Sequence, residues 1–458
     1  MTCDTPVGSG PLSVVTDQAS KSSRRCPALL VSAPASGQGK TTVVAALARH
    51  HSRLGRRVRV LKTGPDFLDP MVHQRACGSP VYPLDLWMVG DALCQQVLHE
   101  AAGDADLILV EGVMGLYDGT PSSADLALRF GLPVAAVIDA GAMAQTFGAL
   151  ALGLARYTPG LTFAGVFANR VASDRHRDML RDSLPAELPW LGNLPKQAGL
   201  ALPSRHLGLH QADAIADLDE RLDRAADLIA TTPLAALPAP ITFQAPPLEP
   251  LPRLLQGLTI AVARDAAFSF VYQANLEVLE AMGAELCFFS PLNDSALPAA
   301  DSLYLPGGYP ELHLDRLADN TAMLTAISTH HRAGKAIVAE SGGMLYLLES
   351  LTTADGHCRQ LAGLIPASAS MGNRLGGLGL QGVHFPQGLL RGHTFHYSTF
   401  DAAPNFTLSA TRHPGGQPGE GVVCDGALTA SYIHWYLSSN PQVAAHLFLG
   451  KAFLEQMP

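Results

Sequence analysis

The chain has 458 residues, of which 47% are hydrophobic, and its formal net charge at pH 7 is −9. This length predicts two domains, or at most three, and the composition provides ample apolar residues for buried cores. The negative charge argues against nucleic-acid binding. No segment has the run of about 18 apolar residues that a membrane helix needs, so we expect no membrane association.

The N-terminal segment and the cysteines indicate the cellular compartment of the protein. Residues 1–26 are polar, carry Gly, Pro and Ser, and lack the apolar region of a signal peptide, so we expect a disordered tail there. The seven cysteines are scattered without C-x-x-C spacing, which predicts neither a disulfide framework nor a zinc site. Both features favour a cytoplasmic protein.

A nucleotide-binding loop follows the first apolar run. Residues 28–31 predict a strand, residues 33–42 read Ala-Pro-Ala-Ser-Gly-Gln-Gly-Lys-Thr-Thr, and a helix is expected over 42–50. A glycine-rich turn between a strand and a helix points backbone N–H groups at phosphates, although Pro34 replaces the first glycine of the usual pattern. Lys40 would reach the outer phosphates and Thr41 would bind Mg²⁺. The predicted ATP-binding residues are Gly37, Gln38, Gly39, Lys40, Thr41 and Thr42.

Further apolar runs predict a parallel sheet. They lie at residues 58–61, 107–110, 134–138 and 163–167, with helix-length segments between them. Runs of this kind are typical of parallel strands buried on both faces. We therefore predict a P-loop α/β domain over residues 27–230.

Acidic residues follow two of these strands. Glu111 comes directly after the run 107–110, and Asp66 and Asp69 follow the run 58–61. Ligands collect at the carboxyl ends of parallel strands, so Glu111 and Asp66 are predicted to hold Mg²⁺ beside the phosphates. For Asp69 and Asp118 the spacing leaves a binding role and a turn-forming role equally open.

A proline-rich segment separates two series of predicted strands and helices. Seven prolines lie between residues 231 and 254, a density that excludes regular structure, and we predict a linker over 231–256. Beyond it, strands are expected near 259–263, 286–289, 302–305 and 336–339, and helices near 269–282 and 317–332. This predicts a second, independent α/β domain over residues 257–450.

The second domain carries a nucleophile-elbow pattern. Residues 336–347 read as a strand, a sharp glycine-flanked turn at Ser341, and a helix. Such a turn raises a nucleophile and aims the N–H of the next residue, Gly342, at an oxyanion. Gly308, after another strand, would provide the second oxyanion donor, and His434 is the candidate general base.

Seven motifs in these places resemble those of one family. They include Gly-Pro-Asp-Phe-Leu-Asp-Pro, Glu-Gly-Val-Met-Gly-Leu-Tyr-Asp-Gly, Leu-Pro-Gly-Gly-Tyr-Pro-Glu and Ala-Glu-Ser-Gly-Gly-Met-Leu-Tyr-Leu, in the family's order over residues 27–441. The chain resembles the cobyrinate and hydrogenobyrinate a,c-diamide synthases. That resemblance implies a dethiobiotin-synthetase-like ATP domain followed by a class I glutamine amidotransferase domain of flavodoxin-like fold.

The resemblance implies ATP-dependent amidation of the a and c side-chain carboxylates of a corrin polycarboxylate through an acyl phosphate. Glutamine or ammonia would supply the nitrogen in this step of cobalamin biosynthesis. The implied metal residues for Mg²⁺ are Thr41, Asp66 and Glu111, and the implied substrate residues are Lys62, Asp69 and Asp118. The cobalt content of the ring, the order of amidation and a homodimer stay open.

One residue departs from the family pattern. The elbow of the family carries cysteine as its nucleophile, whereas this chain has Ser341. A hydroxyl needs stronger base assistance than a thiol, and the position two residues after His434 holds Tyr436 rather than an acid. Three interpretations of Ser341 stay open. The serine is an engineered replacement of a catalytic cysteine, or the natural chain uses free ammonia, or the chain is a weakly active serine glutaminase. The alternative function is a P-loop regulatory ATPase with an inactive amidotransferase-like domain.

Overall fold

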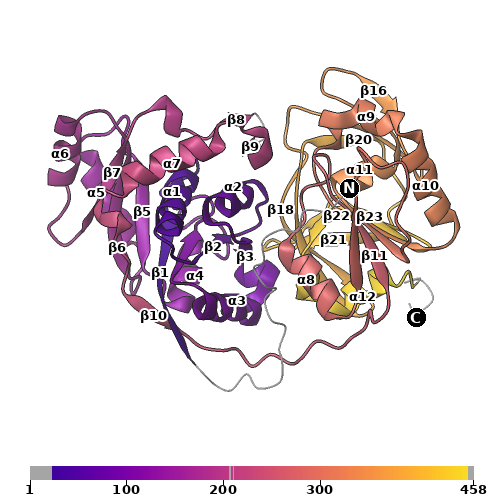
Figure 1. Ribbon diagram of the computed structural model, residues 1–458, viewed down its shortest axis with the longest axis horizontal. Helices are drawn as coiled ribbons and strands as arrows, with labels where there is room; N and C mark the ends of the chain where they lie inside the picture. Colours follow the sequence, from indigo (N-terminus) through magenta and orange to yellow (C-terminus); the bar gives the residue numbers. More distant parts are fainter. Residues whose placement is uncertain (1–22, 206–207, 210, 452–458) are drawn as a thin grey trace. The chain divides into compact units, whose positions relative to one another are not determined.

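The computed structural model in Figure 1 describes residues 23–205, 208–209 and 211–451. The chain divides into two compact units, Met1–Leu248 and Glu249–Pro458. Of the predicted N-terminal tail, residues 1–22 lie outside the described part. The prediction that the tail extends to residue 26 is wrong, because the first strand begins at Arg24.

The first unit is built on a parallel sheet whose strand order is β3-β2-β4-β1-β5-β6-β7. Its strands are β1 (Arg24–Ser32), β2 (Val58–Thr63), β3 (Tyr82–Leu84), β4 (Leu107–Glu111), β5 (Val134–Asp139), β6 (Phe163–Val171) and β7 (Trp190–Pro195). The runs predicted as strands lie in β1, β2, β4, β5 and β6. The P-loop strand β1 lies between β4 and β5, at the point where the strand order reverses and ligands collect.

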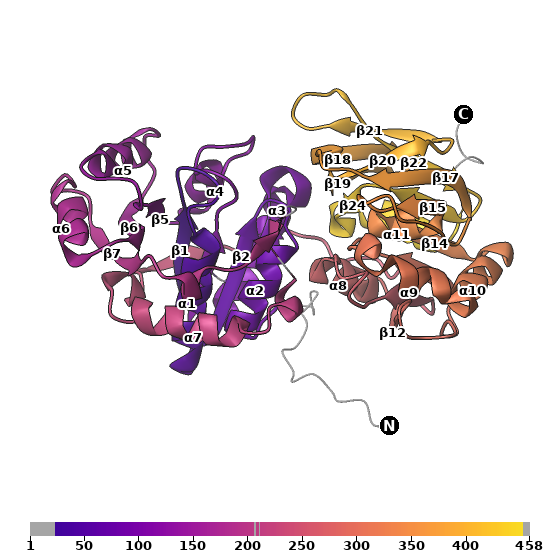
Figure 2. The ribbon, with the colours of Figure 1, turned by 90° about the horizontal axis from the view of Figure 1, so that it is seen from above.

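Helices cover both faces of this sheet. They are α1 (Lys40–Arg53), α2 (Leu68–Cys77), α3 (Asp91–Asp104), α4 (Ser123–Phe130), α5 (Thr146–Arg156), α6 (Asp174–Asp182) and α7 (Leu218–Ile229). Figure 2 shows α1, α2 and α7 on one face and α3, α4 and α5 on the other. Alternate residues of each strand face opposite layers, and both sets are buried in β1. The hydrophobic runs thus form a core on each face.

The proline-rich segment contains a strand, which corrects the prediction that it has no regular structure. Strand β10 (Pro240–Phe243) pairs antiparallel with the start of β1, and Pro27 lies opposite Pro240. Proline has no N–H to donate, so it is tolerated where a strand has a free edge. A hairpin signal was missing because the two strands are more than 200 residues apart.

The second unit has a mixed sheet in the order β12-β11-β13-β14-β23-β22-β21-β18-β19-β24. The parallel part consists of β11 (Thr259–Ala263), β12 (Glu285–Phe289), β13 (Ser302–Leu305), β14 (Ala336–Glu340) and β23 (Leu428–Ser431). The antiparallel part consists of β18 (Gly377–Phe385), β19 (Gly388–His396), β21 (Leu408–Arg412), β22 (Pro418–Asp425) and β24 (His434–Trp435). A smaller sheet contains β15 (Leu348–Thr352), β16 (Cys358–Gln360), β17 (Ile365–Met371) and β20 (Ser398–Ala402). The predicted α/β class is confirmed, with an antiparallel extension that the sequence patterns did not reveal.

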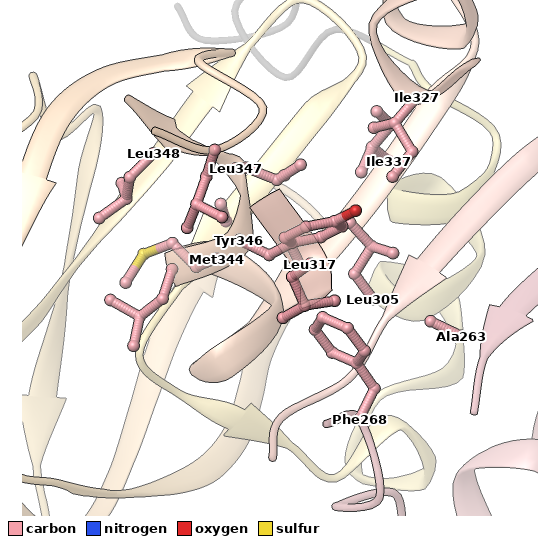
Figure 3. Close-up of a cluster of buried hydrophobic side chains, with 14 of the residues drawn as sticks. Ala263, Phe268, Leu305, Leu317, Ile327, Ile337, Met344, Tyr346, Leu347 and Leu348 are labelled. Atoms are coloured by element: carbon pink, nitrogen blue, oxygen red, sulfur yellow. The ribbon is translucent and has the colours of Figure 1, made fainter. Parts of the chain in front are cut away.

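Helices also pack on both faces of the larger sheet. They are α8 (Gln273–Ala281), α9 (Leu314–Asp319), α10 (Thr321–Arg332), α11 (Gly342–Leu347) and α12 (Pro441–Phe448). The helix expected over 317–332 is two helices, because Asn320 ends α9 and caps α10 by accepting from the Met323 N–H. Figure 3 shows the core on the side of α9, α10 and α11, where Phe268 and Tyr346 lie among aliphatic side chains. This core fixes the start of α11, where Ser341 stands.

None of the helices in the described ranges is both long and apolar enough to cross a membrane.

Candidate functional site

The glycine-rich loop curls between β1 and α1 and is held from two other strands. The Asn169 side chain of β6 donates to the Gln38 carbonyl oxygen at 2.9 Å, and the Gln38 side-chain oxygen accepts from the Asp139 N–H at 2.8 Å. Gly39 has a φ of +92°, and a Cβ there would lie 2.0 Å from Nδ2 of Asn169. Glycine is therefore required at position 39 both for conformation and for space.

We expect Gly39→Ala to weaken nucleotide binding by at least about 10-fold. The methyl group would displace Asn169, and an Ala at this φ costs an additional ~1–2 kcal/mol. Calorimetric titration with ADP would measure the affinity. Gly55→Ala is the matched control, because φ is +78° there while no atom lies within 4 Å of the added carbon. Equal affinities for the two variants would contradict this account of the loop.

Lys40 lies at the first position of α1 with its side chain folded back over the loop. Its Nζ donates to the Ala35 carbonyl oxygen at 3.2 Å and to the Met114 carbonyl oxygen at 2.5 Å. Burial lowers the pKa of this amine to about 8, although the Glu111 carboxylate acts in the opposite direction. A negatively charged ligand here would restore the charged form, because it compensates the lost hydration of the ammonium.

Glu111, the last residue of β4, is 1% exposed and joins the loop to the strand ends. Its Oε1 accepts from the Thr41 hydroxyl at 2.8 Å, and its Oε2 contacts the buried Nε2 of His73 in α2. His73 was missed by the sequence analysis, since it lies inside a helix without a motif of its own. The hydroxyl and the carboxylate that the sequence predicted as neighbours are thus brought together. Thr42 follows them in α1.

Lys62, at the end of β2, lies among three carboxylates. Its Nζ is 2.9 Å from Oδ2 of Asp69, 3.4 Å from Oε1 of Glu111 and 3.7 Å from Oδ2 of Asp66. Burial disfavours its charge, but these carboxylates outweigh it and raise the pKa of Lys62. The ammonium therefore stays charged and holds the acidic groups at one point.

The two aspartates beside Lys62 differ in their proton affinity. Burial and the neighbouring Asp69 carboxylate raise the pKa of Asp66. Burial acts the same way on Asp69, but the charges of Lys62 and His73 outweigh it and lower its pKa to about 2. Asp66 also accepts from the backbone N–H groups of Leu68 at 2.9 Å and Asp69 at 3.3 Å, so it caps the start of α2.

Asp118 is exposed and has a clear local role. Its Oδ2 accepts from the Gly115 N–H at 2.8 Å, which closes the turn after β4. The turn-forming role that the sequence left open is therefore observed in the structure. The opposite carboxylate edge is accessible to a ligand.

Hard oxygen donors near the loop fit Mg²⁺. Among the described residues, no three His, Cys, Asp or Glu side chains gather into a metal cage. Mg²⁺ commonly keeps several waters and is held by one or two protein groups together with phosphates. The adjacent Thr41 hydroxyl and Glu111 carboxylate match that donor set, and Asp66 lies 3.7 Å from the Lys62 ammonium that also contacts Glu111.

The second unit places Ser341 on a strained turn. Ser341 is 7% exposed, and its φ of +47° and ψ of −109° are unusual for a residue with a side chain. Its N–H donates to the Ser431 carbonyl oxygen at 2.7 Å, which ties the elbow to β23. The geometry agrees with the elbow predicted from the sequence.

Two glycines that were predicted as oxyanion donors lie together beside this elbow. A Cβ at Gly342 would lie 3.0 Å from the Gly308 nitrogen, and a Cβ at Gly308 would lie 2.0 Å from the Ala267 carbonyl oxygen. Neither position has space for a side chain. The two backbone turns can therefore approach closely enough to serve one ligand.

His434 lies against the same turns. A Cβ at Gly307 would be 2.1 Å from Cε1 of His434, and the His434 ring stacks on His393 with 5.0 Å between centroids. Its Nδ1 is 4.0 Å from Oε2 of Glu340. Burial, with the nearby His396, lowers the pKa of His434 to about 3. The imidazole is thus neutral and able to accept a proton.

Two family models match the chain. The CobQ/CobB/MinD/ParA nucleotide binding domain matches residues 29–209, and the CobB/CobQ-like glutamine amidotransferase domain matches residues 259–442. A hydrogenobyrinate a,c-diamide synthase of Pseudomonas aeruginosa is 62% identical over 423 residues, which cover 92% of this chain and 97% of that protein. The chain belongs to the a,c-diamide synthase family.

Other members of the a,c-diamide synthase family match over similar lengths. A hydrogenobyrinate a,c-diamide synthase of Stutzerimonas stutzeri is 60% identical and covers 93% of this chain and 99% of that protein. A cobyrinate a,c-diamide synthase of Herminiimonas arsenicoxydans is 50% identical and covers 92% of this chain and 96% of that protein. The family predicted from the seven motifs is confirmed.

In this a,c-diamide synthase chain, the ionisation of His434 and Glu340 predicts a stability maximum. Burial raises the pKa of Glu340 to about 8, although the Tyr304 and Trp435 donors oppose it. Above about pH 4.5 the unfolded state loses a proton from Glu340 that the folded state keeps up to about pH 8, so this group lowers the free energy of unfolding as the pH rises. Below about pH 6.5 the unfolded state takes up a proton on His434 that the folded state excludes down to about pH 3, so the two groups have opposite effects that cancel between about pH 4.5 and 6.5.

We therefore expect the free energy of unfolding to be flat near pH 4.5–6.5 and to fall by about 2 kcal/mol by pH 8 through Glu340 alone. Urea unfolding of the full chain at several pH values would measure it. Glu340→Gln should remove the alkaline part of the decline, because an amide does not titrate. The same slope above pH 6.5 in that variant would rule out Glu340 as its source.

Proposed function

We propose that this chain is an ATP-dependent ligase that converts the a and c side-chain carboxylates of hydrogenobyrinate to amides. The names of the two relatives at 62% and 60% identity support the metal-free ring over cobyrinate. The observation that carries the proposal is the cluster of Lys40, Lys62 and Glu111 at the strand ends beside the phosphate loop. Two ammonium groups and a carboxylate suit transfer of a phosphoryl group to a carboxylate.

In the proposed reaction, an oxygen of the substrate carboxylate attacks the terminal phosphorus of ATP, and ADP leaves. Lys40 stabilises the negative charge on the phosphoryl oxygens during this step. Lys62, held by Asp66 and Asp69, positions the substrate carboxylate and then its acyl phosphate. Ammonia attacks the acyl carbon, phosphate leaves, and the amide forms after loss of a proton.

Mg²⁺ would be held by Thr41, Glu111 and Asp66, and when bound it neutralises phosphate charge. Glu111 is kept in place by His73 on its other oxygen. Asp118 would contact the corrin substrate through its exposed edge. The glycines of the loop, Gly37 and Gly39, let its N–H groups approach the phosphates.

The second unit would supply ammonia from glutamine, with position 341 as the nucleophile, His434 as the base, and Gly308 and Gly342 as oxyanion donors. Ser341 in place of cysteine makes free ammonia the better nitrogen source for this chain. All six cysteines in the described part are free thiols, which suits a cytoplasmic enzyme. A homodimer stays a prediction.

A direct test is an amidation assay with hydrogenobyrinic acid or cobyrinic acid, ATP, Mg²⁺, and either ammonium chloride or glutamine. Mass spectrometry would count the amides formed. We expect diamide formation that requires ATP and proceeds faster with ammonium chloride. Steady ATP hydrolysis unaffected by either corrin would instead favour a regulatory P-loop ATPase with an inactive amidotransferase-like unit, which Ser341 also allows.

A further inference from the structure

A buried carboxylate directly precedes the predicted nucleophile. Glu340 ends β14 and is 1% exposed. Its Oε1 accepts from the Tyr304 hydroxyl at 3.0 Å and from the Trp435 N–H at 3.2 Å. Its Oε2 points to the other side and lies 4.0 Å from Nδ1 of His434. One oxygen is thus anchored while the other faces the candidate base.

A carboxylate at this place is expensive to bury. Strand residue Val338, two positions earlier, contributes to an apolar cluster together with Tyr304 and Trp435. A neutral side chain could accept the same two hydrogen bonds without the desolvation cost of a carboxylate. The hydrogen bonds to Oε1 therefore explain why a polar group stands there, but not why it is an acid.

We propose that Glu340 in its ionised form positions His434, by closing the 4.0 Å gap and accepting a hydrogen bond from Nδ1–H so that Nε2 is left to take the proton of the nucleophile. Burial raises the pKa of Glu340 to about 8, so the ionised form becomes the main one as the pH rises above that value. This inference rests on the proposed glutamine chemistry of the second unit. Two residues after His434, where an acid partner would be expected from the sequence, the chain has Tyr436. Glu340 fills that role from the strand that leads into the elbow.

Neighbouring residues fix the plane of the His434 ring, and its Nδ1 atom faces Glu340. One side of the ring lies against Gly307, and the ring stacks on His393 with 19° between planes. His393 is itself in contact with the Tyr272 hydroxyl at 3.3 Å. Packing restrains the ring plane, so the partner of Nδ1 selects which nitrogen carries the proton.

The proton transfer is balanced as follows. The O–H bond at position 341, or the S–H bond when a thiol stands there, breaks as the side chain attacks the glutamine carbonyl carbon. A new N–H bond forms at Nε2 of His434, and the resulting positive charge lies beside the Glu340 carboxylate. Ammonia then leaves with that proton, which returns the imidazole to its neutral form.

The test uses the full chain with Ser341→Cys, which gives the site a titratable nucleophile, and adds Glu340→Gln. The Trp435 N–H can only donate, so it holds the amide oxygen and turns the amide N–H₂ toward Nδ1. That arrangement enforces the wrong tautomer of His434. At about pH 9, where Glu340 is mostly ionised, we expect the kcat for glutamine hydrolysis to fall about 100-fold, while the KM for glutamine changes less than about 2-fold.

A second readout follows the thiol itself. The rate of alkylation by iodoacetamide against pH gives the apparent pKa of the introduced thiol, and we expect Glu340→Gln to raise it by at least about one unit. Asp315→Asn is the matched control, because Asp315 also faces an imidazole in this unit, His357, at 2.8 Å. It should alter neither readout.

Unchanged hydrolysis and an unchanged alkylation profile in Glu340→Gln would overturn the proposal. So would a loss of hydrolysis accompanied by a lower unfolding temperature and no shift of the thiol pKa, since a structural role alone would then suffice. If Ser341→Cys hydrolyses no glutamine but its thiol pKa still depends on Glu340, the positioning role stands and the proposed glutamine chemistry fails. Absence of both effects would refute both.

Discussion

We expect Lys40→Ala to lower ATP-dependent amidation at least about 1,000-fold with ammonium chloride and with glutamine alike. The ammonium of Lys40 is buried and its pKa is lowered to about 8, so its charge is weakly compensated before a ligand arrives. Phosphate oxygens would provide that compensation, and the interaction strengthens as charge moves during phosphoryl transfer. Without this ammonium, the remaining N–H groups of the loop do not replace the lost stabilisation of the phosphoryl oxygens.

The measurement is the initial rate of amide formation at saturating ATP, with thermal unfolding as a check on folding. Lys335→Ala is the matched control. Its Nζ donates to the Ala300 carbonyl oxygen at 2.6 Å, as Lys40 donates to carbonyl oxygens, but it lies in the second unit away from Ser341. We expect its rate within about 2-fold of the parent. A Lys40→Ala rate above one tenth of the parent would exclude a role for this amine in the chemistry.

The residues of the phosphate loop could be predicted because their geometry is local. A strand, two glycines and a helix start are all contained in residues 28–50, and the structure places them as β1, the loop and α1. The common location of Lys62 and Glu111 could also be predicted, because the carboxyl ends of parallel strands meet at one edge of the sheet. The pairing of β2 with β4 sets them opposite each other.

Other contacts could not be predicted because they join distant segments without a motif. Asn169 reaches the loop from β6, 131 residues beyond Gln38, and His73 reaches Glu111 from the middle of α2. Strand β10 was hidden by its prolines, which are compatible with an edge strand but not with the usual strand pattern. In each case the partner is chosen by topology rather than by sequence spacing.

Glu340 illustrates the same limit at the second site. Sequence spacing points to the position two residues after His434 for an acid partner, where this chain has Tyr436. The structure instead brings Glu340 to His434 because β14 pairs with β23, with Glu340 opposite Ser431. The acid is 94 residues before the base, yet adjacent to the nucleophile position.

The second large effect is expected from Ser341→Cys. We expect amidation with glutamine to rise about 100-fold or more, while amidation with ammonium chloride stays within about 2-fold. A serine hydroxyl is barely ionised near neutral pH, whereas a thiol ionises readily and is intrinsically more nucleophilic. In the proposed site, Gly342 adjoins Gly308 and His434 packs against Gly307, so the thiol is the one proposed group that this chain lacks.

The assay with ammonium chloride separates the chemistry of the first unit from the nitrogen supply by the second. It reports the ATP-dependent chemistry of the first unit alone, so a gain confined to glutamine assigns the deficit to the nitrogen supply. Adding His434→Ala to Ser341→Cys should abolish the gain and leave the ammonium rate intact, since the thiol then lacks its base. If the unmodified chain used glutamine and ammonium chloride equally well, its glutamine hydrolysis would not be impaired. Ser341 would then act as a fully active nucleophile, which would refute this prediction.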